Sequence, residues 1–333
     1  MPKKRKDTDY LSISARIRVM ENRLLTKNRM ERMLEARTDE ETAKVLSECG
    51  YGELTDLSPT AVDAAMVRAR DALCRDLEQA VPDRRLVELF QIKYDYHNAK
   101  VLLKGAATGA KADRLLTGGG RYDPKKLAEN VAAGTLEEYS PTFRAAVAEA
   151  AEVLKETGDP QKADIRLDRA WFEEMAATAK ESRSAYLQGY VALMADAANL
   201  RTAVRAARMG LDETFVGKAL VPGGTVKEEV FRTTKAAELD QALKNTPLAQ
   251  AAALGAERAE PGSGSVTAFE KACDDAVTAY LAKAKGVPFG EAPVAGYLYA
   301  RETERTAIRT ILSGRAAGLS ADTIRERLRD LYV

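Results

Sequence analysis

The chain has 333 residues, of which 30% are charged and 45% are hydrophobic, and its 51 lysines and arginines nearly cancel its 50 aspartates and glutamates. A chain of this length exceeds what one hydrophobic core comfortably organises, so we expect two or three compact units. The balanced charge argues against a generic nucleic-acid-binding protein, which usually carries a basic excess.

The N-terminus opens with a short basic run, Lys3-Lys4-Arg5-Lys6. A nuclear-import signal or an anionic-surface patch can look like this, but we interpret the run as a solvated tail without a functional role. No apolar core of a signal peptide follows it, and no apolar stretch in the chain reaches the length of a membrane-spanning helix. The sequence therefore predicts a chain without a transmembrane segment that stays inside the cell.

Apolar residues recur at three- and four-residue steps over long spans, and only 6% of the residues are aromatic, so we predict a mostly α-helical chain. Helices are expected to begin where a capping side chain precedes the first turn, at Thr38 with Glu41, Ser58-Pro59, Asp123-Pro124 and Ser140-Pro141. Glycine-rich segments predict turns at 117–120 and 221–224 and a flexible linker at 261–265. None of them has the Lys-Ser/Thr pair of a phosphate-binding P-loop.

Residues that often carry chemistry form no constellation. The three cysteines, Cys49, Cys74 and Cys273, are far apart, which favours reduced thiols packed as small hydrophobic groups. The single histidine, His97, has no sequence partner for catalysis, so a structural role is expected. Adjacent acids such as Glu173-Glu174 and Asp274-Asp275 point about 100° apart on a helix, and we interpret them as solvated. The sequence thus predicts no catalytic centre, metal site or cofactor.

The clearest organising signal is an internal repeat, in which an acid is followed by two residues, Asn or Ala, an apolar residue and a base. The three copies run from Asp95 to Lys100, from Asp196 to Arg201 and from Glu304 to Arg309. Each copy precedes a glycine turn, at Gly119-Gly120, Gly223-Gly224 and Gly318 respectively. We therefore predict three related helical domains, with approximate bounds 1–112, 113–217 and 218–333.

The repeated acid and base lie five positions apart, so they do not form an ideal pair within one helical turn. Their side chains are expected to face neighbouring helices or a shared cavity, whereas the apolar members fill cores, namely Leu102, Leu103, Val204, Ile311 and Leu312. Arg301, Arg305 and Arg309 recur at four-residue steps and share one helical face. That face is either solvated or a surface that binds a partner.

Motifs in a fixed order along the chain resemble the C subunit of the V/A-type (vacuolar/archaeal-type) ATPases and ATP synthases, the counterpart of the eukaryotic V-ATPase d subunit. They are Tyr10 with Ala15-Arg16-Ile17-Arg18, Gly50-Tyr51, the segment from Tyr94 to Lys100, Asp196 with Asn199-Leu200-Arg201, Pro288-Phe289-Gly290 and the final Leu331-Tyr332-Val333. The sequence departs from the family pattern at Ala99, Ala292 and Ala307.

The resemblance implies an all-α protein in which three related domains form a pseudo-threefold funnel. It also implies a non-catalytic central-stalk subunit, a socket that couples the rotor shaft to the membrane proteolipid ring. Through this socket, ATP hydrolysis or ATP synthesis is linked to the transport of protons or sodium ions. The expected partners are the central rotor stalk subunits and the proteolipid ring, with the stator membrane subunit as a further candidate. The expected location is the cytoplasm, peripherally associated with the membrane through the complex, with no nucleic acid and no cofactor.

If a pseudo-threefold axis relates the copies, their basic residues occupy equivalent places around it. We therefore hypothesise that seven basic side chains bind a partner: Lys100, Lys104, Arg201, Arg205, Arg301, Arg305 and Arg309. The alternative is a helical nucleic-acid-binding protein that uses the basic N-terminal run and the C-terminal arginine stripe. The scarcity of aromatic residues and the lack of a recognisable binding module weigh against that alternative.

Overall fold

The computed structural model describes residues 5–110 and 113–333. Lys3 and Lys4 of the basic run lie outside the described residues, as does residue 112, the predicted end of the first domain. The described residues form helices and loops without a strand, which confirms the all-α prediction. The chain divides into two compact units, Met1–Arg84 with Ala237–Val333 (unit 1) and Arg85–Ala236 (unit 2). The division into three domains and the funnel stay predictions.

Unit 1 is built from both ends of the chain. Its helices are α1 (Leu11–Glu21), α2 (Lys27–Glu35), α3 (Asp39–Glu48), α4 (Pro59–Ala80), α12 (Leu239–Leu243), α13 (Ala249–Glu257), α14 (Thr267–Ala282), α15 (Glu291–Ala316) and α16 (Ala321–Arg325). Short 3₁₀ turns precede α1 and α15, at Asp7–Tyr10 and Lys283–Gly286, and a third, Ala236–Glu238, lies at the boundary with unit 2.

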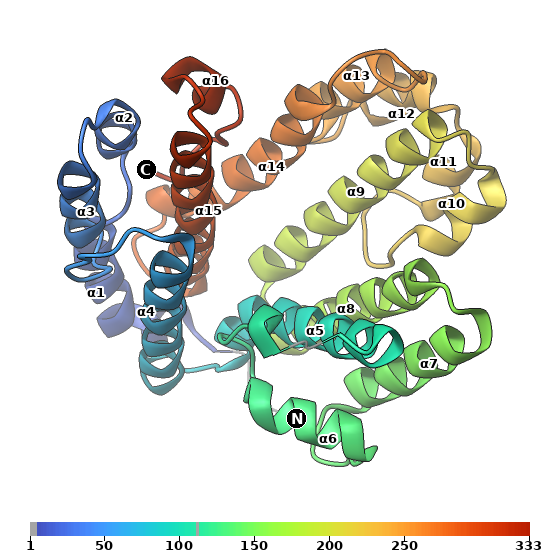
Figure 1. Ribbon diagram of the computed structural model, residues 1–333, viewed down its shortest axis with the longest axis horizontal. Coiled ribbons are helices and arrows are strands. Elements are labelled where there is room, and N and C mark those ends of the chain that lie inside the picture. The colour runs from blue at the N-terminus through green and yellow to red at the C-terminus, as the bar shows by residue number, and fades with distance from the viewer. Residues whose placement is uncertain (1–4, 111–112) are drawn as a thin grey trace. The chain divides into compact units, whose positions relative to one another are not determined.

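The long helix α15 organises unit 1. It packs against α1, α2 and α4 from the N-terminal part and against α14 and α16 from the C-terminal part (Figure 1). Met33 and Leu46 share one apolar cluster with Ile308 and Ile311 of α15, and all four side chains are fully buried. Burial of this shared apolar surface holds the two ends of the chain in a single unit.

Unit 2 is one continuous stretch of chain. Its helices are α5 (Arg85–Thr108), α6 (Pro124–Ala133), α7 (Pro141–Thr157), α8 (Pro160–Ser182), α9 (Ala185–Arg208), α10 (Glu213–Ala219) and α11 (Glu228–Thr233), with a 3₁₀ turn at Asp113–Leu115. Helix α8 packs against α5, α7 and α9. Helices α10 and α11 pack against α9 (Figure 1).

Local signals predicted the helix starts correctly. The Thr38 hydroxyl accepts a hydrogen bond from the Glu41 amide, and Ser58, Asp123 and Ser140 cap helices whose first residue is proline. The glycine segments at 117–120 and 221–224 are non-helical, as predicted. Segment 261–265, which was predicted to be a flexible linker, contains a hydrogen-bonded turn between α13 and α14, and these two helices pack against each other.

The burial of single residues agrees in most cases with what the sequence predicts. All three cysteines are free and buried, as expected. Leu103, Val204 and Ile311 are buried, whereas Leu102 and Leu312 are half-buried. His97 is exposed, and its Nε2 atom lies 3.1 Å from the Leu115 carbonyl oxygen, which agrees with a structural role.

Candidate functional site

Side chains of the repeated segment of α5 form hydrogen bonds with the loop that follows the helix. The Asn98 side chain exchanges two hydrogen bonds with the Thr117 backbone, with Nδ2 donating at 2.8 Å and Oδ1 accepting at 2.9 Å. The Asp95 carboxylate accepts from the backbone amide of Arg121 at 3.0 Å and from its Nε at 2.7 Å. Two side chains on one helical face thus satisfy the polar backbone of the loop.

The second copy, on α9, repeats this arrangement. Asn199 exchanges hydrogen bonds of 2.9 and 2.8 Å with the Val221 backbone, and Asp196 accepts from the amides of Thr225 and Val226 at 3.0 and 3.1 Å. The partner of Asp lies four positions after the partner of Asn in both copies. The two copies are therefore equivalent in hydrogen bonding as well as in sequence.

The glycines that follow these helices are part of the same arrangement. A Cβ atom added to Gly120 would lie 2.2 Å from Oδ1 of Asp95, and one added to Gly224 would lie 2.1 Å from Oδ1 of Asp196. Both distances are far below van der Waals contact, so each loop can approach its carboxylate only because glycine has no side chain. The glycine turns are thus explained by close approach to the repeated acid.

Helix α15 carries the third copy, and its partners differ. The Glu304 carboxylate accepts from the Leu25 amide at 2.5 Å, from the Tyr51 hydroxyl at 2.6 Å and from Arg301 Nη1 at 2.6 Å. Gly318 instead ends α15 with a left-handed conformation, and a Cβ atom there would meet nothing within 4 Å. A glycine turn thus follows the third copy, as predicted, but Gly318 makes no close approach of the kind seen at Gly120 and Gly224.

Burial raises the pKa of all three repeated carboxyl groups. The pKa of Asp95 rises to about 6, and those of Asp196 and Glu304 also rise, although neighbouring hydrogen-bond donors oppose the shift in each case. A carboxyl group whose pKa is raised by folding contributes less to stability as the pH rises through that pKa. The hydrogen bonds around these carboxylates offset part of the free-energy cost of burying their charge.

Glu174 was expected to be solvated, and this interpretation is wrong. Its side chain is buried on α8, where Oε2 accepts from the Tyr96 hydroxyl at 2.8 Å and Oε1 accepts from Ser140 Oγ at 2.6 Å and Arg121 Nη1 at 2.7 Å. Glu174 thereby links α8 to α5, to the start of α7 and to the loop at Arg121. Its neighbour Glu173 is exposed, as predicted.

The basic residues of α5 that were predicted to bind a partner have acidic neighbours on α8. Lys100 Nζ lies 2.5 Å from Asp168 Oδ1, and Lys104 Nζ lies 2.5 Å from Asp164 Oδ2. The equivalent residues of α9 are Arg201, which is half-buried, and Arg205, which is exposed. Within unit 2 the lysines therefore also join two helices.

On α15 the three arginines lie in different surroundings. Arg301 donates to the Cys49 carbonyl at 2.9 Å, and its guanidinium carbon lies 4.6 Å from the centre of the Tyr51 ring. Arg305 is buried and donates to Glu302 at 3.2 Å. The interpretation of the stripe as a solvated face is therefore wrong for these two residues, whereas Arg309 is exposed and pairs with Asp63 of α4 at 2.5 Å.

The ion pair between Arg309 and Asp63 should contribute little to stability. Both side chains are almost half exposed, and water and salt weaken the attraction between exposed charges. We expect Arg309→Gln to change the free energy of unfolding by less than about 1 kcal/mol. Urea denaturation of the full chain measures this change, and a loss several times larger would show that Arg309 has a structural role beyond this pair.

The sequence was also compared with the profiles of known protein families. The sequence profile of the family described as ATP synthase (C/AC39) subunit matches residues 13–327, nearly the whole chain. The chain belongs to this family.

The chain is similar to C subunits of V-type and A-type enzymes from several organisms. It is 22% identical to the C subunit of the V-type sodium ATPase of Enterococcus hirae, over 97% of this chain and 99% of the relative. It is 32% identical to the C subunit of the V-type ATP synthase of Thermus thermophilus, over 61% and 65% of the two chains. It is 24% identical to the C subunit of the A-type ATP synthase of Methanocaldococcus jannaschii, over 97% of this chain and 86% of the relative. The resemblance drawn from the sequence motifs is confirmed.

Among residues 5–110 and 113–333, no cluster of His, Cys, Asp and Glu side chains is arranged to hold a metal ion. No helix within those same ranges combines the length and the apolar character needed to cross a membrane.

The contacts that Arg121, Glu174 and Tyr51 make with the repeat were not predicted from the sequence. Arg121 and Glu174 complete the hydrogen bonding of the first copy, and Tyr51 completes that of the third. Arg121 directly follows the glycine turn, which was a usable signal. Glu174 and Tyr51 are remote in sequence from the groups that they contact, and no spacing rule points to them.

Proposed function

We propose that the chain is the non-catalytic central-stalk subunit of a V/A-type rotary ATPase, a socket that couples the rotor shaft to the membrane proteolipid ring. The match of the family profile to residues 13–327 carries this proposal. In this role the protein transmits torque, ATP is hydrolysed or made on other subunits, and protons or sodium ions cross the ring. The chain associates peripherally with the membrane through the complex.

The hydrogen bonds between the repeated helices and the loops that follow them support a mechanical role. A protein that transmits torque must resist deformation, and a loop joined to its helix through several hydrogen bonds moves together with that helix. Asp95 with Asn98 and Asp196 with Asn199 provide such bonds at two equivalent places. Glu304 provides them in unit 1 by joining α15 to Leu25 and Tyr51.

Co-purification tests the proposal. The affinity-tagged full chain is isolated from native membranes in a mild detergent, and the accompanying proteins are identified by mass spectrometry. We expect the stalk and proteolipid subunits in a fixed ratio to the chain. Recovery of the intact, folded chain without either of them would contradict the proposal.

Among the seven basic residues, we propose that Arg205 and Arg309, which are exposed, and Lys104, which is half-buried, make the direct contacts with a partner. The other four residues then stabilise the helices that carry these contacts; they are Lys100, Arg201, Arg301 and Arg305. Exposed charges steer association and select partners more than they stabilise the chain itself.

Charge reversal at two of these residues should weaken the complex. We expect the double variant Arg205→Glu and Arg309→Glu to lower recovery of the stalk subunits by about tenfold or more, because each change replaces attraction by repulsion. The matched control is Lys125→Glu with Lys155→Glu, which reverses two exposed lysines of α6 and α7. Equal recovery with both double variants, each folded by circular dichroism, would remove Arg205 and Arg309 from the contact surface.

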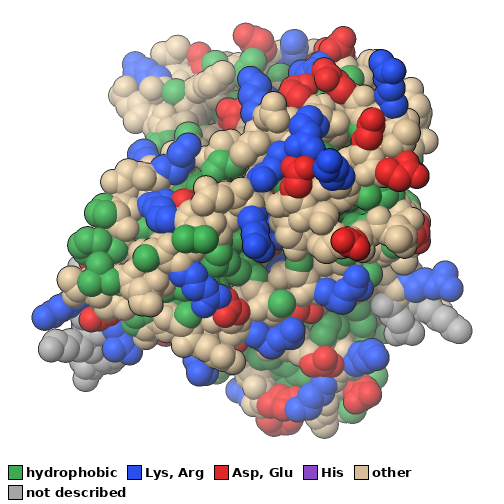
Figure 2. All heavy atoms as spheres, turned by 90° about the vertical axis from the view of Figure 1, so that its left-hand side faces the viewer, with side chains coloured by type: hydrophobic (Ala, Val, Ile, Leu, Met, Phe, Trp, Pro, Cys, Tyr) green, Lys and Arg blue, Asp and Glu red, His purple; other side chains and the backbone are tan. Residues whose placement is uncertain are grey.

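The nucleic-acid-binding alternative is less well supported. Figure 2 shows acidic and basic side chains interspersed over one face of the molecule, and phosphate binding favours a continuous basic surface. Two arginines of the C-terminal stripe, Arg301 and Arg305, are also engaged inside unit 1. A mobility shift with DNA or RNA that weakened steeply with salt would revive this alternative.

A further inference from the structure

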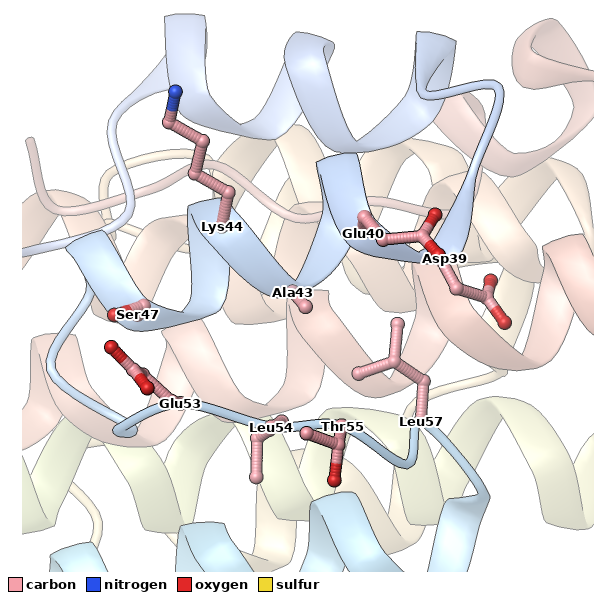
Figure 3. A pocket seen from close by; sticks show the side chains of 9 residues that line it. All are labelled: Asp39, Glu40, Ala43, Lys44, Ser47, Glu53, Leu54, Thr55 and Leu57. Atoms are coloured by element: carbon pink, nitrogen blue, oxygen red, sulfur yellow. The ribbon is translucent and has the colours of Figure 1, made fainter.

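Unit 1 contains a groove between α3 and the extended segment that follows it, here called the α3 groove. Its volume is about 520 Å³, and its apolar lining comes from Ala43 of α3 and from Leu54 and Leu57 of the segment (Figure 3). The two leucines pack partly against the core of unit 1 and remain half-buried. Their apolar surface is therefore available to another side chain from outside.

Acidic side chains border the α3 groove. Asp39, Glu40 and Glu53 are exposed and line it, whereas the single basic lining residue, Lys44, points away from the two leucines (Figure 3). Asp39 and Glu40 lie in the first turn of α3, where negative charge stabilises the helix dipole. Glu53 lies in the extended segment, so helix stabilisation does not account for the whole acidic border.

We infer that the α3 groove binds a basic amphipathic helix of a partner protein. A helix of this kind would place aliphatic side chains, spaced three and four residues apart, on Ala43, Leu54 and Leu57. Its lysines or arginines would then face Asp39, Glu40 and Glu53, where charge complementarity selects a basic partner over an acidic one. The inference does not rest on the proposed function, since the groove and its charges belong to unit 1 alone.

A designed peptide tests the inference. The probe is a fluorescein-labelled helical peptide of about 16 residues, with leucines along one face and lysines elsewhere. Its binding to the full chain is measured by fluorescence anisotropy at moderate salt. We expect Glu53→Lys and Ala43→Gln each to weaken binding about fivefold or more, the first by repulsion and the second by filling the groove. The matched control, Glu152→Lys on the exposed face of α7, should change binding by less than about twofold.

Three results would overturn the inference. The first is equal binding by Glu53→Lys, Ala43→Gln and the control, with unchanged thermal unfolding showing that all three fold. The second is equally strong binding of a peptide in which glutamates replace the lysines. The third is self-association of the chain in sedimentation that Ala43→Gln abolishes, because the occupant would then be a second copy of the chain.

Discussion

Gly120→Ala and Gly224→Ala are each expected to destabilise unit 2 strongly. The added Cβ atom would lie 2.2 Å from a carboxylate oxygen of Asp95 in the first variant and 2.1 Å from one of Asp196 in the second. Because each carboxylate also accepts hydrogen bonds from the backbone just after the glycine, relief of the clash must break some of them. We expect losses of about 2–4 kcal/mol in the free energy of unfolding, measured by urea denaturation.

The control for these variants is a glycine with space around it. A Cβ atom on Gly286 would meet nothing within 4 Å, and its φ angle lies outside the left-handed region, so Gly286→Ala should change stability by less than about 0.5 kcal/mol. If Gly120→Ala and Gly224→Ala behaved like Gly286→Ala, the loops would be free to move away from their carboxylates. The close approach would then have no role in stabilising unit 2.

The repeat shows how far spacing along the chain can predict structure. The acid, the asparagine and the glycine turn of the first two copies were all visible in the sequence, because the groups that they join lie within about thirty residues of each other. The third copy has a similar acid, but its partners, Leu25 and Tyr51, come from the other end of the chain. Gly318 was matched to the turns by order alone, and only the structure reveals its different role.

The arginines of α15 illustrate a second limit. Helical periodicity predicted that Arg301, Arg305 and Arg309 share a face. It does not indicate what covers that face, and in the structure the Tyr51 ring and the Cys49 carbonyl lie against Arg301 while Arg309 remains exposed. For the same reason Glu174 could not be distinguished from its exposed neighbour Glu173. Helix starts were predicted well because capping depends only on adjacent residues.

Glu304→Ala is expected to have the largest effect on unit 1. The Glu304 side chain is buried, and its carboxylate accepts hydrogen bonds from the Leu25 amide, the Tyr51 hydroxyl and Arg301. Truncation would leave the largely buried Arg301 guanidinium without its carboxylate and two buried donors without an acceptor. We expect a loss of about 3–5 kcal/mol in the free energy of unfolding, with faster hydrogen exchange of the Leu25 amide.

Two further variants separate charge from hydrogen bonding at Glu304. Glu304→Gln keeps an acceptor oxygen but removes the charge opposite Arg301, so its loss should be smaller than that of Glu304→Ala. Tyr51→Phe removes one donor and leaves the ion pair, which should cost about 1 kcal/mol. The pair between Arg309 and Asp63 supplies the reference, because it is also an arginine–carboxylate pair but is exposed to solvent. If Glu304→Ala cost no more than Arg309→Gln, the carboxylate would not be what joins α15 to the N-terminal part of unit 1, and the apolar cluster around Ile308 and Ile311 would have to do so alone.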